Sequence, residues 1–564
     1  MSTWTSARAS WLGALSAKLG ALPPKRVTWG LVAIFSSWVL LDVMHLRLTS
    51  GLAKPSFDAM VRARVFAAAP DPRIVIIDID EASLARMGRE FGRWPWPRDT
   101  LATVLDFVER QQPAAVVWDI LFSDADKLNP GGDAAFNQAV QRSAHSHFSV
   151  TRLPKENDAA SQITRAALPG LWGKSGTGSS STVALIPPAL PAIAASRMGF
   201  NNGYVDDDGV LRRYRYLEPL ADGSTIQSLP MSVLNTMYPI AYREYYLKAR
   251  GQIDSKDELM TWRKQSNSYP QVNFADVFAQ AEGGQPLGRE SVNLPSLAGK
   301  VVIIGSTAPS LHDIHPTPLA ANHSGVDALA TAIDNALNQR HLTELPRWLQ
   351  AAVAIAMCVG LGVWVQFKSV ASLAPALFAL PAALLGLSYL SLNGLPFFLD
   401  LNLAAALALV FLAVLRVWST LRRNHWCALP EISGSAESMA IWPWIRKDAW
   451  LDAPLDRLID AVQRHAPDCR IVAGDATAVW PAKLRWPELA RCVAVVGPQA
   501  SVQHAREKLA PALSRLAQRS GDMVVLQNTA DRENLANRVV QAWSTLQNSD
   551  TSSNGLKPSV LSRD

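Results

Sequence analysis

Four long stretches without a charged side chain limit what this chain of 564 residues can fold into. The hydrocarbon core of a bilayer is about 30 Å thick, and a helix needs about 20 apolar residues to cross it. Water-soluble helices are rarely uncharged over such a length. The uncharged stretches are residues 27–41, 348–367, 369–399 and 401–415, and the first reaches membrane-spanning length when it is extended past Asp42 to Leu46. We therefore predict four transmembrane helices, at residues 27–46, 348–367, 370–392 and 397–418.

The first stretch raises the alternative of a cleaved signal peptide. No A-x-A cleavage motif directly follows it, and the 26 residues before it are long for the basic region of such a peptide. The three later stretches also favour a membrane anchor. We therefore expect residues 1–26 to stay attached as a cytoplasmic N-terminus.

Basic side chains near the predicted spans indicate the orientation, because cytoplasmic segments of membrane proteins are enriched in Lys and Arg. The first 26 residues contain four basic residues and no acid, Lys368 lies between the second and third spans, and Arg416, Arg422 and Arg423 lie at or after the end of the last span. With four spans, all of these lie on one side. This predicts a multi-pass membrane protein, with residues 47–346 outside the cytoplasm and residues 419–547 in the cytoplasm.

Composition excludes several other classes of protein. Hydrophobic residues make up 49% of the chain and charged residues 18%, whereas a disordered chain is poor in the first and rich in the second. Four cysteines in 564 residues exclude a disulfide scaffold. The net charge of +6 needs no nucleic-acid partner, since the chain has no basic run interleaved with aromatic residues.

The region predicted to lie outside has the pattern of an α/β domain. Residues 73–80 and 114–120 are apolar runs typical of buried parallel strands. Between them, apolar side chains from Leu101 to Val108 follow helical spacing. Strand, helix and strand in this order predict a right-handed βαβ unit. Residues 182–186 and 301–305 predict further strands.

A series of motifs runs through the same region. They are Phe57-Asp58, IVIIDIDEASL at 74–84, WPWPR at 94–98, VVWDILFSD at 116–124, Gly199-Phe200, DDDGVLRR at 206–213, VVIIGSTAP at 301–309, Asp313, Thr317-Pro318 and Gly325-Val326-Asp327. In this order, and with three spans after them, the motifs resemble the type-two CHASE family of extracellular sensory domains, over residues of about 45–340. One departure is that Leu329-Ala330 stand where the family often has His-Ala. The resemblance implies a sensor and names no signal.

Polar residues at the ends of the predicted strands form the candidate ligand site, because ligands of open α/β sheets bind at the carboxyl ends of strands. Converging carboxylates would hold a cation or an amine, while the tryptophans would line the pocket and the arginine would pair with one of the acids. The alternative is structural, with the acids capping helices and bracing loops and the tryptophans packing a helix entry. The candidate residues are Asp78, Asp80, Glu81, Trp94, Trp96, Arg98, Asp119 and Asp313.

Two patterns resemble ligand motifs and carry little weight. His312-Asp313-Ile314-His315, with His323 downstream, has the residue types of a metal site. Without a helix and a fourth ligand such spacing is common by chance. Gly173-Lys174-Ser175 resembles the end of a phosphate-binding loop, but Leu168 stands at the position of the required first glycine. We therefore expect no metal and no cofactor.

Residues 419–547 predict a small α/β domain. Strands at 469–473, 492–496 and 523–526 alternate with helices, one of which we expect to kink or end at Pro511. The sequence shows no protein-kinase motifs, no phosphoacceptor helix, no paired aspartates of a nucleotide cyclase and no acidic pair of a phospho-receiver. We expect a binding domain without catalytic activity, followed by a disordered tail at 548–564.

Together, these features and the resemblance predict a signal-transduction protein of a bacterial inner membrane, with residues 47–346 in the periplasm. It would have an α/β extracellular sensor domain for a small ligand or a protein, four transmembrane helices in the lipid bilayer, and a small α/β cytoplasmic domain that binds a partner protein. We expect a homodimer, because a helix can then move against its twin. Two alternatives remain, a non-sensing scaffold of an envelope complex and a membrane enzyme with an unrecognised effector domain.

Overall fold

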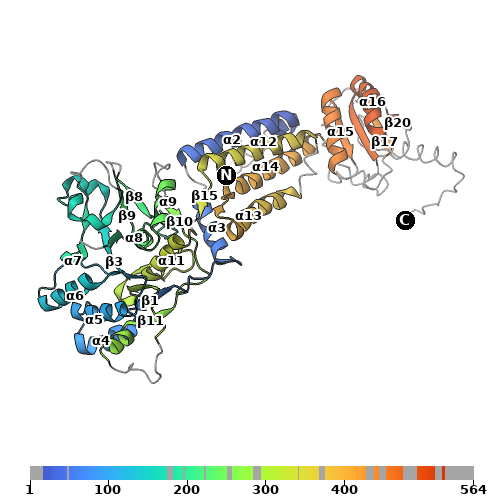
Figure 1. Ribbon diagram of the computed structural model, residues 1–564. Helices are drawn as coiled ribbons and strands as arrows, with labels where there is room; N and C mark the ends of the chain where they lie inside the picture. The colour runs from blue at the N-terminus through green and yellow to red at the C-terminus, as the bar shows by residue number, and fades with distance from the viewer. Residues whose placement is uncertain are drawn as a thin grey trace, which may run out of the picture. The chain divides into compact units, whose positions relative to one another are not determined.

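A computed structural model gives the fold of the chain (Figure 1). Its elements form two compact units, which we call the sheet unit and the helical unit. The sheet unit comprises residues 50–345 and 387–400, and the helical unit comprises residues 1–49, 346–386 and 401–564. The structure describes residues 17–46, 50–174, 182–194, 197–220, 224–249, 257–283, 294–340, 342–367, 375–426, 437–443, 452–473, 492–514 and 524–526.

A sheet of seven strands is the centre of the sheet unit. Its order is β11-β1-β12-β2-β3-β5, and β6 also pairs with β3. All pairs are parallel except that of β3 with the short β5. The strands are β1 (Ile74–Asp78), β2 (Ala115–Trp118), β3 (Ser146–Arg152), β5 (Leu185–Ile186), β6 (Arg197–Phe200), β11 (Gln271–Asn273) and β12 (Val301–Gly305).

Helices cover both faces of this sheet, because the central strands are apolar on both sides. Val75, Val116 and Val302 pack on one face with the first group of helices, and Ile74, Val117 and Ile303 pack on the other with the second group. Figure 1 shows α4, α5 and α6 beside the strands. The first group is α4 (Glu81–Phe91), α5 (Arg98–Glu109), α6 (Pro130–Arg142) and α10 (Phe274–Ala281), and the second is α8 (Leu229–Met237) and α11 (Gly325–Leu337).

Short elements complete the sheet unit. The small strands form a three-stranded sheet, β4-β9-β8, and three pairs, β7 with β10, β13 with β14 and β15 with β16. Their bounds are β4 (Trp172–Lys174), β7 (Arg213–Tyr214), β8 (Leu217–Pro219), β9 (Thr225–Gln227), β10 (Glu258–Leu259), β13 (Ile314–His315), β14 (His323–Ser324), β15 (Thr343–Glu344) and β16 (Phe397–Phe398). The helices and turns are α3 (Ser50–Arg62), α7 (Pro191–Ala194), α9 (Pro239–Ala249), η2 (Lys155–Ala160), η3 (Arg165–Ala167), η4 (Pro169–Leu171) and η5 (Pro309–Leu311).

The sheet differs from the expected βαβ unit in one respect. Strands β1 and β2 are both present, but β12 lies between them and pairs with each. A strand that is far away in the sequence thus occupies the centre of the sheet. As a result, the loop after β12 lies between the ends of β1 and β2, where the candidate residues are.

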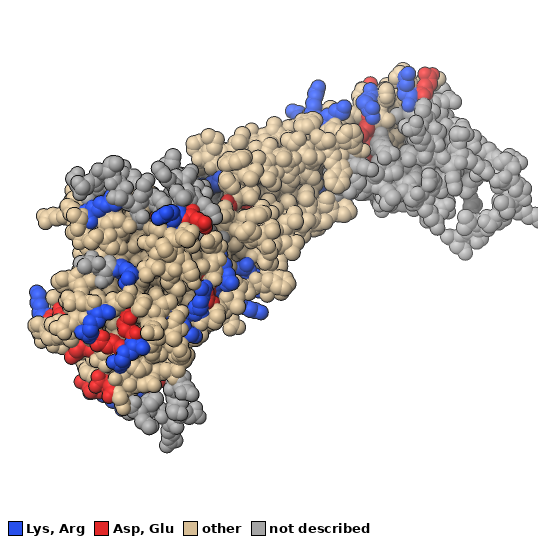
Figure 2. Space-filling model, viewed as in Figure 1, with Lys and Arg blue, Asp and Glu red and all other residues tan. Residues whose placement is uncertain are grey.

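Among the residues that the structure describes, four helices are long and apolar enough to cross a membrane. They are α2 (Pro24–Leu41), which continues as the π-helical turn η1 (Asp42–Leu46), α12 (Arg347–Phe367), α13 (Ala376–Gly394) and α14 (Asn402–Trp426). The fourth expected span begins later than predicted, at Asn402, because Phe397 and Phe398 form β16. Figure 2 shows few charged side chains on the visible face of these helices.

The last part of the helical unit is a four-stranded antiparallel sheet with two helices. The strand order is β18-β19-β17-β20. Helix α16 continues past Pro511 to Ser514, so of the two expected outcomes at this proline the end is wrong, and the kink stays a prediction. The expected tail at 548–564 lies outside the described residues. The elements are β17 (Glu437–Pro443), α15 (Asp452–His465), β18 (Arg470–Ala473), β19 (Cys492–Pro498), α16 (Gln499–Ser514) and β20 (Val524–Leu526).

Candidate functional site

The predicted acids lie at the carboxyl edge of the sheet, in two groups on either side of β12. Asp78, Asp80 and Glu81 follow β1, whereas Asp119 follows β2. Asp313 follows the loop after β12 and interacts electrostatically with Asp119. The acids therefore form two groups, and each group has its own partners.

The group after β1 is occupied by contacts within the fold. The Asp78 carboxylate accepts hydrogen bonds from the Thr307 amide at 2.8 Å and from its hydroxyl at 2.5 Å. Asp80 caps α4 by accepting from the Ser83 amide at 2.7 Å. Glu81 accepts from the Ser310 amide at 2.9 Å, and this bond lowers the pKa of Glu81. These bonds fit the structural alternative for the three acids, in which they cap a helix and hold the loop after β12.

The aromatic and arginine candidates also make contacts within the fold. Trp96 is buried and packs against Phe274 at a ring-centroid distance of 5.3 Å, and Trp94 meets Trp96 edge-on at 4.9 Å. The guanidinium of Arg98 pairs with Asp133 of α6 at 2.6 Å instead of with one of the predicted acids. The turn 94–98 therefore joins α5 to α6 and to the core.

The second group forms a polar cluster with three residues that the candidate list lacks. Asn201 Nδ2 donates to Asp119 Oδ1 at 2.6 Å, and the Tyr214 hydroxyl donates to Asn201 Oδ1 at 2.9 Å. His315 Nε2 lies 3.4 Å from Asp313 Oδ1. We call Asp119, Asn201, Tyr214, Asp313 and His315 the Asp119 cluster.

The charged groups of the Asp119 cluster influence one another's pKa values. Burial, and then the nearby charge of Asp313, raise the pKa of Asp119 to about 7. The hydrogen bond with Asp313 raises the pKa of His315. Burial, with a contribution from Asp119, raises the pKa of Tyr214 well above its usual range. A proton or a cationic group would relieve the repulsion between the two carboxylates, so the cluster has the chemistry to respond to either.

Solvent reaches one side of this cluster. The side chains of Asp313 and His315 are 41% and 36% exposed, whereas Tyr214 is buried. Gly325 opens α11 directly beneath the Asp313 carboxylate, and a Cβ at this position would overlap both of its oxygens. The glycine of the Gly-Val-Asp motif therefore gives Asp313 its place at the start of the helix, where a negative charge is favoured.

The histidines of the discarded metal pattern separate in the structure. His315 belongs to the Asp119 cluster, His312 is exposed, and His323 is buried beside Asp327, with 2.7 Å between Nε2 and Oδ2. Among the residues described, no group of three His, Cys, Asp or Glu side chains is placed to hold a metal ion.

Two motif arginines that precede Tyr214 in the chain join other elements of the sheet unit. Arg212 is buried and pairs with Asp58 of α3 at 2.7 Å and with Asp206 and Asp208 at 2.8 Å. Arg213, next to Tyr214, pairs with Glu344 of β15 at 2.8 Å. The DDDG motif and the two arginines after it thus form an ionic link between α3, β7 and β15.

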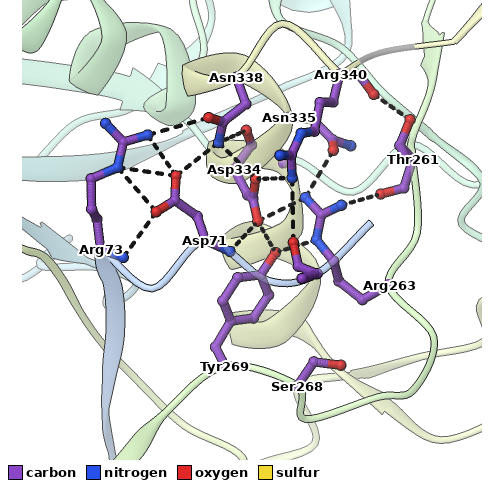
Figure 3. Close-up of polar contacts among 12 residues, drawn as sticks. Asp71, Arg73, Thr261, Arg263, Ser268, Tyr269, Asp334, Asn335, Asn338 and Arg340 are labelled. Atoms are coloured by element: carbon purple, nitrogen blue, oxygen red, sulfur yellow. Dashed lines mark hydrogen bonds and ion pairs between the residues drawn. The ribbon is translucent and has the colours of Figure 1, made fainter. Parts of the chain in front are cut away.

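A second polar network lies at the opposite, amino end of β1 (Figure 3). The buried Arg263 and Asp334 form an ion pair at 2.8 Å, with exposed fractions of 1% and 0% for their side chains. The Tyr269 hydroxyl and the Asp71 amide both donate to Asp334 Oδ2 at 2.9 Å. This network joins the segment before β1 to α11. The two side chains of its ion pair are shielded from solvent.

Asn201, Tyr214 and His315 were missed as site residues by sequence reasoning. Asn201 directly follows the Gly-Phe motif, and Tyr214 directly follows the Arg-Arg motif. Their positions next to motif residues were the available signal, but neither lies at the end of an apolar run. His315 was considered only for metal binding.

The fold and the site define a class of protein, an α/β domain in a chain with four helices of membrane-spanning length. The family model for the CHASE2 domain matches residues 31–364, more than half of the chain. The chain belongs to the CHASE2 domain family, which is a family of sensory domains. The resemblance to the type-two CHASE family is thereby confirmed. The search of curated proteins and the search of solved structures each found no match.

Proposed function

We propose that this protein is a bacterial inner-membrane sensor. Its periplasmic CHASE2 domain receives a small ligand or a protein at the Asp119 cluster. The transmembrane helices relay the resulting shift to residues 419–547, which bind a cytoplasmic partner protein without catalysis. Membership in a family of typically extracellular sensory domains and the four membrane-length helices support the first and second parts. The basic residues beside the spans support the orientation.

The observation that carries the proposal is a continuous set of backbone contacts from the Asp119 cluster to the connection between two spans. Tyr214, a member of the cluster, lies in β7 and is the register partner of Glu258 in β10. The next residue of β10, Leu259, accepts a hydrogen bond from the Leu342 amide at 3.0 Å. Strand β15 follows directly and pairs with β16.

Strand β16 lies in the short connection between α13 and α14, so a movement of β7 reaches the ends of two spans through paired backbones. The Arg213–Glu344 ion pair fixes the side chains across the same elements at 2.8 Å. A ligand shifts the equilibrium between two arrangements of these strands only if it binds one arrangement more tightly than the other. The Asp119 cluster provides the charges for that difference, because neutralising Asp119 alters the hydrogen bond that it accepts from Asn201, and Asn201 in turn accepts a hydrogen bond from Tyr214 of β7.

A ligand screen on the full chain in nanodiscs tests the proposal. Cationic amines, amino acids and small organic ions are added at saturation, and the thermal unfolding midpoint is measured. A ligand at 100 times its dissociation constant adds about 2.7 kcal/mol to stability, which gives a measurable rise in the midpoint. The rise is expected to vanish in Asp313→Asn and to persist in Asp124→Asn, which removes an exposed acid. If no compound stabilises the protein, the result favours the non-sensing scaffold.

A further inference from the structure

Two apolar side chains project from the sheet unit directly after α3. Val65 is 63% exposed and Phe66 is 72% exposed. Full burial of a side chain of this kind stabilises a fold by about 1.5–3 kcal/mol. Because both side chains are exposed, the protein lacks a large part of this stabilisation. A single exposed apolar residue is common on protein surfaces. The argument therefore depends on where these two residues lie.

Both residues are fixed to the end of a membrane-length helix. The Tyr389 hydroxyl of α13 donates to the Ala63 carbonyl at 2.8 Å. The backbone amides of Val65 and Phe66 both donate to Asn393 Oδ1 at 3.2 Å. Tyr389 and Asn393 belong to the last turns of α13, so the segment 63–66 lies against the end of this span.

The length of α13 places this segment near the surface of the bilayer. Its 19 residues extend over about 28 Å at 1.5 Å per residue, which is close to the thickness of about 30 Å of the hydrocarbon core. Asn393 is the residue before the last and therefore lies near the boundary of that core. Leu395 and Phe397 follow and are 43% and 38% exposed. We call Val65, Phe66, Leu395 and Phe397 the apolar rim.

We propose that the apolar rim inserts into the lipid bilayer, at the boundary between headgroups and acyl chains. The backbone contacts suit that position, because amides that enter a poorly hydrated region need a protein acceptor, and Asn393 supplies one for two amides. Tyrosine is enriched at this level of the membrane, and Tyr389 has its hydroxyl on the same segment. The proposal rests on the crossing of the membrane by α13 and goes beyond the sensing function.

Insertion of the apolar rim gives α3 a fixed depth. The C-terminal end of α3 is tied to the rim through Ala63, and its Asp58 is tied to Arg212. The membrane surface thereby becomes a contact surface of the sheet unit. A change of bilayer thickness or composition would act on α3 directly.

Site-directed spin labelling of the full chain tests this proposal. The four native cysteines are replaced by serine, and Phe66→Cys, Leu128→Cys and Leu387→Cys are labelled and reconstituted in phosphatidylcholine–phosphatidylglycerol nanodiscs. Leu128 is 98% exposed in a loop of the same unit, and Leu387 is 50% exposed on α13 itself. Accessibility is measured to oxygen, which enriches in lipid, and to a water-soluble nickel chelate. We expect the oxygen-to-nickel ratio at 66 to exceed that at 128 several-fold and to approach that at 387.

Three results would overturn the proposal in different ways. A ratio at 66 equal to that at 128, with a lipid-like ratio at 387, rejects insertion of the rim alone. A water-like ratio at 387 rejects the membrane crossing on which the rim rests, and with it the sensor topology. Exclusion of both reagents at 66, with dipolar broadening of the spectrum, shows that a second copy of the chain covers the rim. Val65→Cys repeats the measurement if Phe66→Cys does not reconstitute.

Discussion

At the scale of single residues, Asp119 makes the stability of the protein depend on pH. Its pKa of about 7 lies above the value of about 3.9 for an unfolded chain. Between these values the folded state binds a proton that the unfolded state does not, so stability is highest at low pH within this window and falls as the pH rises from about 4 to about 7. We expect Asp119→Asn to flatten this slope and to unfold at a higher temperature than the wild type at pH 8.

The measurement is the thermal midpoint of the full chain at several pH values. The side-chain amide introduced by Asp119→Asn keeps an acceptor oxygen for Asn201, so the substitution removes mainly the charge. Asp124→Asn, on an exposed residue, makes the same charge change away from the cluster. Equal slopes for Asp119→Asn and the wild type would show that another group dominates the pH dependence.

Gly325 leads to a second prediction at this scale. A methyl group here overlaps the Asp313 carboxylate, and forcing an extra methyl into a packed site costs about 1–3 kcal/mol. We expect Gly325→Ala to lower the free energy of unfolding by this amount and Asp313→Ala to recover part of it in the double variant. Gly88→Ala is the control, because nothing lies within 4 Å of its added methyl. Additive effects of the two substitutions in urea unfolding would argue against the overlap.

Part of the site followed from the sequence. Asp119 and Asp313 were found because polar residues at the ends of parallel strands converge on one edge. The same rule also selected Asp78 and Asp80, whose carboxylates are taken by Thr307 and Ser83. Which acids find partners depends on the loop after β12, and the sequence does not reveal that β12 lies between β1 and β2.

At the scale of elements, the buried network before β1 is expected to contribute strongly to stability. Arg263→Met leaves Asp334 as a buried anion without its partner at 2.8 Å, and breaking a buried ion pair costs about 3–5 kcal/mol. Replacing both partners, by Arg263→Met with Asp334→Leu, should cost less than Arg263→Met alone. Arg110→Met, an exposed arginine on the same unit, should change stability by less than about 0.5 kcal/mol. Urea unfolding of the full chain measures all three, and a double variant less stable than the single one would contradict this account.

The strands that the sequence predicted are more apolar than the strands that it did not predict. Strands β1, β2 and β12 are apolar runs, because helices cover both of their faces. Strand β3 contains serine, histidine, threonine and arginine, and β11 has only three residues, so neither gives a clear apolar signal. The order of the strands is tertiary information that periodicity does not carry.

At the scale of the whole molecule, the signals for the four spans were the strongest in the sequence, because a bilayer demands long uncharged helices regardless of tertiary context. All four helices appear in the structure at the expected places, with shifted ends. The start of α14 was misplaced because Phe397 and Phe398 are apolar like the span that follows, although they pair with β15. Apolarity alone does not separate a short strand from the long helix that follows it.

The last prediction concerns the two compartments. In a background without native cysteines, Leu128→Cys and Glu507→Cys place one exposed thiol in the sheet unit and one in α16. We expect a membrane-impermeant maleimide to label Leu128→Cys in intact spheroplasts and to label Glu507→Cys only after permeabilisation, because three helices of membrane-spanning length lie between the two positions and three crossings would put these positions on opposite sides of the membrane. The cysteine-free parent gives the background in both conditions. Labelling of both thiols before permeabilisation, with the spheroplasts intact, would mean that one of these helices does not cross the membrane, and reception of an external signal would then need a different topology.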